Sequence, residues 1–159
     1  MTISCFSAHV WIYSRNFCEK SLKDYSSLLK HARVAQKRSH SPYSRFRVGS
    51  ALLTTSGKIY KGCNIEVSSY GLTICAERTA IFKAVSEGEK KFRAIAIVSD
   101  ERGFISPCGA CRQVIMDLAG DIDIVMSNGA GKYKTLLTSE LLPHPFGPED
   151  LKRNRRRKK

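Results

Sequence analysis

Three cysteines and one glutamate, carried by two short segments, constrain this chain more than any other feature. Cys75 is followed two residues later by Glu77, and further along the chain Pro107 precedes Cys108 and Cys111. Three thiolates can hold one zinc ion and leave its fourth position to water, which is typical of catalytic rather than structural zinc sites. Glu77 is not needed as a ligand, so its carboxylate can move protons to and from that water. The chain must therefore fold so that these two segments meet.

The spacing of apolar residues places both cysteine segments at the start of helices, predicted over 75–85 and 108–118. A helix N-terminus offers unpaired N–H groups and partial positive charge, which lower thiol pKa values and stabilise thiolates. Residues three apart share a helix face, so Cys108 and Cys111 can bind the same ion. Pro107 is typical of a helix start, where its missing N–H removes no hydrogen bond.

Three thiolates are electron-rich and oppose the lowering of the pKa of a zinc-bound water. A positive side chain that donates to a sulfur would correct this, and Arg78 is the first candidate because it lies one helical turn after Cys75. Arg112 has two interpretations of equal weight, a second tuning charge or a solvated surface residue. A structural zinc site would need a fourth ligand; Cys63 is the nearest candidate, but its predicted strand position favours the core.

The order of the predicted elements is typical of an α/β fold. Apolar periodicity and turn residues predict helices over 19–38, 75–85 and 108–118, strands over 48–54, 59–65, 94–98, 122–126 and 133–137, and an irregular to helical segment over 141–151. This alternation favours a central mixed sheet with helices on its faces. We predict one domain over 21–151, preceded by a leader or disordered extension over 1–20 and followed by a basic disordered tail over 152–159.

The net charge of +13 lies mostly at the ends of the chain. Residues 152–159 carry seven basic side chains and no acidic one, whereas residues 45–151 carry thirteen basic and twelve acidic side chains. The part that carries the chemistry is thus nearly neutral, which argues against a nucleic-acid partner. No apolar run approaches the length of a membrane span, so no membrane partner is expected.

The cysteine chemistry predicts a reducing compartment, and we expect the cytoplasm. Six cysteines would suit disulfides in a short secreted chain, but three of these have metal-ligand spacing and must stay reduced. The tail is interpreted as a solvated end, with a nuclear-localisation signal as the next hypothesis. The apolar stretch 8–13 has no basic residue before it and makes a poor signal peptide. Arg15, with no acidic residue before Glu19, leaves a mitochondrial interpretation open.

Several segments, taken together and in order, resemble one known family. They are FRVGSA (46–51), GCNIE (62–66), CAERTA (75–80), SPCGACRQ (106–113), LLP (141–143) and FGP (146–148). These segments resemble the small, homotetrameric, three-cysteine cytidine deaminases, and the resemblance runs from about 41 to 151. It implies a three-layer α-β-α sandwich with a central mixed five-stranded sheet, and one zinc ion per subunit. Ser50, the loop 70–73 and both ends depart from the family pattern.

The same resemblance implies a substrate site. Asn64 and Glu66 would hydrogen-bond the ribose, and an amide and a carboxylate two residues apart on a strand do point to one face. Phe46 and Phe146 would pack on the pyrimidine ring, although each could equally be an ordinary core aromatic residue. Tyr70 and Ala76 would also contact substrate. In the family the counterparts of Phe146 and Tyr70 come from a neighbouring subunit, so the resemblance implies a homotetramer with shared active sites.

The expected function is zinc-dependent hydrolytic deamination of free cytidine and 2′-deoxycytidine to uridine and 2′-deoxyuridine, with Glu77 as the catalytic proton carrier. The alternative is a nucleic-acid-editing cytosine deaminase that uses the basic tail. Against it, the tail lacks interleaved aromatic residues, and polynucleotide-editing enzymes usually place histidine where this chain has Cys75. A non-catalytic zinc-binding oligomer is a third hypothesis, which the presence of Glu77 opposes.

Overall fold

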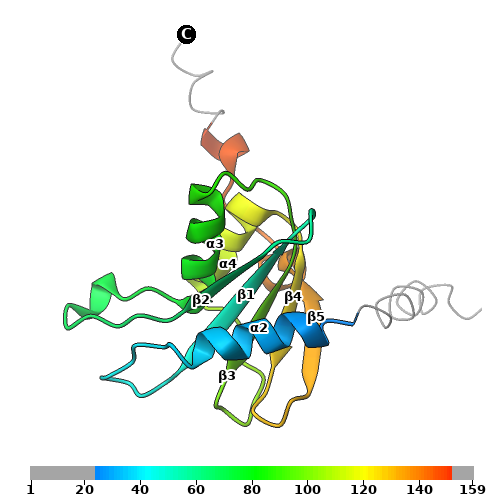
Figure 1. Cartoon of the computed structure of the whole chain (residues 1–159). Helices are drawn as coiled ribbons and strands as arrows, with labels where there is room; N and C mark the ends of the chain where they lie inside the picture. Colours follow the sequence, from blue (N-terminus) through cyan, green and yellow to red (C-terminus); the bar gives the residue numbers. More distant parts are fainter. Residues whose placement is uncertain (1–23, 152–159) are drawn as a thin grey trace, which may run out of the picture.

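Five strands form one mixed sheet in the order β2-β1-β3-β4-β5 in the computed structural model, which describes residues 24–151 (Figure 1). The strands are Val48–Thr54 (β1), Ile59–Cys63 (β2), Phe92–Ser99 (β3), Asp123–Ser127 (β4) and Tyr133–Leu137 (β5). β3 and β4 are parallel, while every other neighbouring pair is antiparallel. The predicted extension over 1–20 and the basic tail over 152–159 lie outside the described residues.

Helices cover both faces of this sheet. They are Ser26–Gln36 (α2), Ala76–Ser86 (α3), Gly109–Ala119 (α4) and the short Thr138–Leu141 (α5), with a 3-10 turn at Tyr70–Leu72 (η2). Figure 1 shows α2 on one face and α3 with α4 on the other. The predicted three-layer sandwich around a mixed five-stranded sheet is confirmed.

A hydrophobic core lies on each face of the sheet, and side chains of alternating size along β3 contribute to the two cores in turn. Along β3, Ala94 and Ala96 pack with α2, whereas Ile95 and Ile97 pack with α3 and α4. This is the alternation expected of a strand buried on both faces. The alanines thus belong to the core beneath α2, and the isoleucines to the core beneath α3 and α4.

Glycine sets how closely α3 approaches the sheet. A Cβ atom on Gly62 of β2 would lie 2.4 Å from the carbonyl oxygen of Ala76 and 2.5 Å from the backbone nitrogen of Ala80. No side chain fits there, because these neighbours are backbone atoms that cannot move aside. The first turn of α3, directly after Cys75, is therefore held against β2.

The direction of the strands brings the two predicted cysteine segments together. β2 and β3 are each antiparallel to β1, so they run in the same direction. Their C-terminal ends therefore meet at one edge of the sheet, as they do in parallel sheets. The chain leaves β2 toward α3 and leaves β3 toward α4, and both helices lie on the same face. Both helices consequently begin near the same edge.

The boundaries differ from the sequence-based prediction at α2, which spans 26–36 within the predicted 19–38, at β3, which spans 92–99 instead of 94–98, and at the end of β2. The strands over 48–54 and 133–137 match exactly, but β2 ends at Cys63 rather than Ile65. After Cys63 the chain leaves the sheet and makes single bridges from Ile65 to His40 and Ile74. The part of the 19–38 helix that falls before residue 24 lies outside the described residues. No helix in the range 24–151 combines the length and apolar character that crossing a membrane requires.

Candidate metal centre and active site

The three predicted cysteines converge. The Sγ atoms of Cys75, Cys108 and Cys111 all lie within 4.8 Å of one another, and those of Cys75 and Cys108 are 3.9 Å apart. Cys75 is the N-cap of α3 and Cys108 the N-cap of α4, while Cys111 lies in the first turn of α4. The two helix N-termini therefore point their partial positive charge at one cluster of sulfur atoms.

This cluster fits a zinc ion. Tetrahedral coordination with Zn–S bonds of about 2.3 Å places sulfur atoms about 3.8 Å apart, close to the separation of Cys75 and Cys108. The pKa of Cys75 is lowered to about 5, because the Cys111 thiol donates a hydrogen bond to its sulfur and Arg78 donates another. The pKa of the buried Cys111 is raised, since it holds the proton that it shares with Cys75.

Arg78 lies where a charge-tuning residue was predicted. Its Nη2 atom is 3.5 Å from Cys75 Sγ and 3.4 Å from the carbonyl oxygen of Thr73. Its pKa is raised, chiefly because the guanidinium donates to the Cys75 sulfur. Among side-chain nitrogen and oxygen atoms of residues 24–151, Arg78 Nε alone is buried without a hydrogen-bond partner. A guanidinium held in this way beside three sulfurs fits a cluster that carries negative charge.

Arg112 is neither a second charge beside the sulfurs nor a solvated surface residue, the two roles that the sequence left open. It donates from Nε to the Pro107 carbonyl at 2.8 Å, from Nη1 to the Leu141 carbonyl at 2.9 Å, and from Nη2 to Ser106 Oγ at 2.9 Å. It therefore binds the backbone just before Cys108 to the end of α5 instead of contacting a sulfur or remaining solvated. A contact to Leu141, far along the chain, has no local signal in the sequence.

Cys63 is not part of the cluster. It lies at the end of β2, where its Sγ donates to the carbonyl oxygen of Arg38 at 3.3 Å. Its side chain is partly exposed, so the prediction of a core position was wrong. Burial nevertheless raises the pKa of this thiol.

Glu77 is buried in the first turn of α3, with only 5% of its surface exposed. Its pKa is raised to about 7, because burial removes the water that would stabilise the carboxylate; the negative charge of Cys75 acts in the same direction. A carboxyl group with a pKa near neutrality can both accept and release a proton. This position beside Cys75 suits proton transfer at the metal.

A backbone bridge joins the segment that carries Asn64 and Glu66 to the residue just before Cys75. Ile65, between them, forms a two-bond bridge with Ile74, in which both N–H···O distances are 3.0 Å, and Ile74 directly precedes Cys75. Asn64 and Glu66 are buried whereas Ile65 is exposed, so the two polar side chains share a face as predicted. They do so outside the strand, because β2 has already ended.

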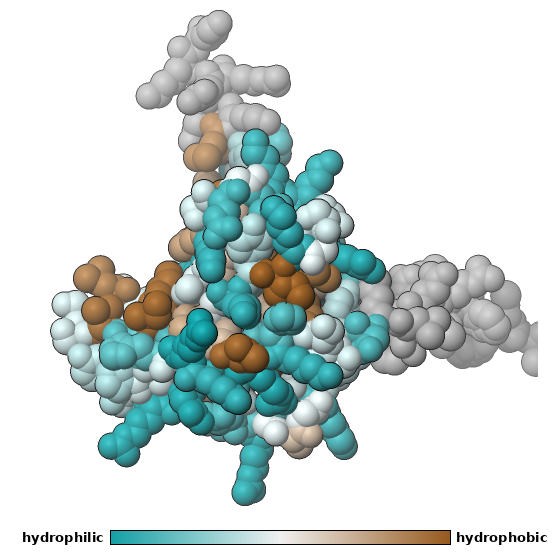
Figure 2. Space-filling view, in the orientation of Figure 1, coloured by the Kyte–Doolittle hydropathy of each residue, from teal (hydrophilic) through white to brown (hydrophobic). Residues whose placement is uncertain are grey.

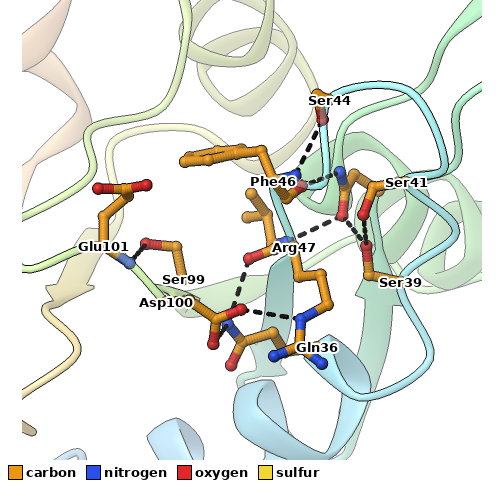
Figure 3. Close-up of polar contacts among 11 residues, drawn as sticks. Gln36, Ser39, Ser41, Ser44, Phe46, Arg47, Ser99, Asp100 and Glu101 are labelled. Atoms are coloured by element: carbon orange, nitrogen blue, oxygen red, sulfur yellow. Dashed lines mark hydrogen bonds and ion pairs between the residues drawn. The ribbon is translucent and has the colours of Figure 1, made fainter.

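Asn64 binds the backbone on both sides of Arg47, the residue that follows Phe46. Its Nδ2 donates to the Phe46 carbonyl at 2.8 Å, and its Oδ1 accepts from the Val48 N–H at 2.9 Å (Figure 3). Ser39 Oγ also donates to Asn64 Oδ1, at 2.6 Å. Asn64 thereby sets the backbone that carries Phe46, a contact that the motif alone did not reveal.

A second set of contacts supports the same loop. Gln36 Nε2 donates to the Arg47 carbonyl at 3.2 Å and to Asp100 Oδ1 at 3.0 Å, and Arg47 Nε donates to Asp100 Oδ2 at 2.8 Å. Figure 3 shows this network joining the end of α2, the loop and the end of β3. The residue after Phe46 is thus held by two other elements.

Glu66 binds the turn before Phe46. Its Oε2 accepts from the N–H groups of Tyr43 and Ser44 at 2.9 and 3.2 Å, and its Oε1 accepts from the Ser44 hydroxyl. The pKa of Glu66 is lowered, chiefly by this hydroxyl bond, so the carboxylate stays ionised. Tyr70 OH also donates to Glu66 Oε1 at 3.4 Å.

The remaining predicted residues do not gather in one pocket of a single chain. Tyr70 meets Glu66 and stacks edge-on against Tyr43. Phe146 is 59% exposed, and Phe46 is also exposed at its ring. Ala76 is fully buried in the core beneath α3, so only its backbone could contact a ligand.

The fold and the cysteine cluster together define a zinc-binding deaminase. Residues 22–127 match the family model described as the cytidine and deoxycytidylate deaminase zinc-binding region, and the chain belongs to this family. The three-cysteine cluster is accordingly a zinc-binding site.

Within this family the chain is similar to cytidine deaminases. The cytidine deaminase of Sporosarcina psychrophila is 47% identical over 129 residues, which cover 80% of this chain and 95% of that protein. A probable cytidine deaminase of Dictyostelium discoideum is 52% identical over 121 residues, covering 76% and 82%. The crystal structure of cytidine deaminase from Burkholderia pseudomallei superposes with a TM-score of 0.75 at 42% identity, covering 78% of this chain and 100% of that one. The resemblance inferred from the motifs is confirmed.

Two serine substitutions test the metal site. We expect Cys111→Ser to lose most of its zinc, because removal of one of three ligands leaves a weak site. Cys63→Ser is the matched control and should keep one zinc ion per chain, since Cys63 lies outside the cluster. Metal analysis of the dialysed proteins, with circular dichroism to check folding, gives the result. Equal zinc content in the two variants would contradict the assignment.

Proposed function

We propose that this chain is a cytidine deaminase, a hydrolase that removes the 4-amino group of free cytidine and 2′-deoxycytidine. Water replaces the amino group, so the products are uridine or 2′-deoxyuridine and ammonia. The observation that carries the proposal is the buried carboxylate of Glu77, held in the helix turn that begins at Cys75. The similarity to proteins named cytidine deaminases supports the choice of substrate.

Glu77 moves the protons in this reaction. When bound, zinc supplies a Lewis acid that makes water a nucleophile at neutral pH. The Glu77 carboxylate accepts a proton from the attacking water and delivers it to N3 of the pyrimidine, which makes C4 electrophilic. It then takes the second proton, from the hydroxyl now on C4, and passes it to the departing amine, so that C4 becomes a carbonyl and ammonia leaves. A pKa raised to about 7 by burial is suited to a group that both takes and gives a proton.

Arg78 compensates for the thiolate-rich ligand set in this mechanism. Its guanidinium donates to Cys75 Sγ at 3.5 Å, which withdraws charge from one ligand. The metal thereby remains electrophilic enough to lower the pKa of water. Because oxidation would remove the thiolate ligands, the proposal also places the protein in the cytoplasm, which cell fractionation would test.

Asn64 and Glu66 are proposed to bind the ribose. Both are buried beside the segment that carries Cys75, and both hold the loop that carries Phe46. The lowered pKa of Glu66 keeps it ionised, and a carboxylate accepts a hydrogen bond from a sugar hydroxyl. The same carboxylate would repel a phosphate attached to that hydroxyl. This favours a free nucleoside over a polynucleotide.

Aromatic side chains complete the proposed site. Phe46 is placed by the Asn64 contacts, and its exposed ring can pack on the pyrimidine. Phe146 and Tyr70 are exposed in the single chain and would contact the substrate of a neighbouring subunit. Ala76 would contribute its backbone.

Glu77→Gln is the direct test of the mechanism. The amide has the same shape but cannot carry the proton, so we expect turnover to fall by about 10²–10⁴-fold or more, with zinc content unchanged. Glu87→Gln, at the other end of the same helix, removes the same charge and should keep normal activity. The loss of ultraviolet absorbance of cytidine measures both. Near-normal turnover in Glu77→Gln would rule out this role.

A substrate panel separates the proposal from the nucleic-acid alternative. Cytidine, 2′-deoxycytidine, their monophosphates and a cytosine-containing single-stranded oligonucleotide are each incubated with the full chain. We expect turnover of both nucleosides and little of the oligonucleotide, because Glu66 repels phosphate. Turnover of the oligonucleotide alone would favour the editing function, and turnover of none would favour a non-catalytic zinc protein.

The chain is further proposed to form a homotetramer, as its resemblance to the three-cysteine enzymes implies. Exposed apolar side chains surround η2, including Ile65, Val67 and Leu72, the last with 74% of its surface exposed. Figure 2 shows apolar atoms on the projecting segment where η2 lies. Patches of this kind are typical of association surfaces, and they support an oligomer.

Mixing two impaired variants tests whether subunits share active sites. Glu77→Gln and Phe146→Ala are co-expressed, so that some sites combine Glu77 of one subunit with Phe146 of another. Random assembly restores about a quarter of such sites in a symmetric oligomer. Activity should therefore exceed the mean of the two variants measured alone, and light scattering should give the mass of four chains. A stable, fully active monomer would contradict the proposal.

A further inference from the structure

Gln113 binds both backbone groups of Phe146. Its Nε2 donates to the Phe146 carbonyl at 2.6 Å, and its Oε1 accepts from the Phe146 N–H at 3.2 Å. A side-chain amide that meets one residue in this way replaces the pair of hydrogen bonds that a neighbouring strand would make. The two residues are 33 positions apart in the sequence, so the contact joins distant parts of the chain.

Gln113 lies on the same short stretch of α4 as the zinc ligands. Cys108 caps this helix, Cys111 lies in its first turn, and Gln113 follows two residues later. Arg112, between them, donates to the Leu141 carbonyl at 2.9 Å. One side of α4 thus holds the metal, while the neighbouring positions hold the chain segment that runs from Leu141 to Phe146.

The segment around Phe146 has no sheet partner of its own. Residues 142–147 belong to no helix or strand, and Phe146 is 59% exposed. A ring this exposed takes its direction largely from its backbone. The main support of that backbone is the Gln113 amide, together with a bond from the Gly147 N–H to Asp150 Oδ2 at 3.0 Å.

We infer that Gln113 is a positioning residue for substrate binding, because it holds Phe146 so that its ring is presented to the pyrimidine. This inference rests on the proposed function, in which the Phe146 ring contacts the substrate of a neighbouring subunit. Gln113 itself touches no substrate. It links the orientation of that ring to the helix that binds zinc in the same subunit.

The amide is the side chain that this role requires, since it offers one donor and one acceptor. Glutamate in its place would still accept from the Phe146 N–H but would turn an oxygen toward the Phe146 carbonyl, and two acceptors repel. Gln113→Glu therefore breaks half of the contact without changing side-chain volume. Gln113→Ala removes both bonds.

A double-mutant cycle on cytidine turnover tests the inference. Gln113→Ala should lower kcat/KM by about tenfold, the scale of two ordinary hydrogen bonds, mainly through a higher KM and with zinc content unchanged. Gln113→Glu should give a similar or larger loss. In the Phe146→Ala background, Gln113→Ala should cause no further loss, because there is no ring left to position. Asp117→Asn, on an exposed position one turn further along α4, should keep normal kinetics.

The possible failures can be told apart. An equal loss from Gln113→Ala in both backgrounds, or a loss of zinc, would assign Gln113 a purely structural role in α4 and overturn the inference. A loss in Phe146→Ala but none in Gln113→Ala would also overturn it, while leaving Phe146 in the site. Normal kcat/KM in Phe146→Ala would overturn it with deaminase activity intact. Only the absence of cytidine turnover by the unaltered chain would refute the proposed function itself.

Discussion

Three cysteine sulfurs held within 4.8 Å of one another are the constraint on which the rest of this structure depends. Such a cluster repels itself unless positive charge surrounds it. The structure supplies that charge from the N-termini of α3 and α4 and from Arg78, and zinc adds the largest share. The sheet makes this possible, because β2 and β3 run in the same direction and deliver both helices to one edge.

The irregular segments around the metal centre are organised by side chains that bind backbone. Asn64 holds the loop of Phe46, Gln113 holds Phe146, and Arg112 holds the approach to Cys108. Loops lack the repeating ladders that satisfy strands and helices, so their buried polar groups need such partners. The two rings proposed to contact the pyrimidine are thus positioned by amide contacts, whereas Glu77, the proposed proton carrier, lies on a helix.

Features governed by neighbours in the chain were predictable from the sequence. The strands over 48–54 and 133–137, the helix starts at both cysteine segments and the proximity of Arg78 to Cys75 follow from periodicity, capping and helical spacing. The end of β2 could not be predicted in this way, because Asn64 and Ile65 are as compatible with a strand as the residues before them. Their departure from the sheet is decided by the bridges from Ile65 to His40 and Ile74.

The sequence by itself determined the metal chemistry, since three cysteines at two helix starts define a zinc site, with Glu77 beside it as the proposed proton carrier. Tertiary structure alone decided what the long polar side chains do. Arg112 and Gln113 follow Cys111 directly, yet their partners Leu141 and Phe146 come from a segment at the far end of the chain. The packing of the helices against the sheet decides which backbone groups lie opposite those side chains. The spacing of residues along the chain does not predict that packing.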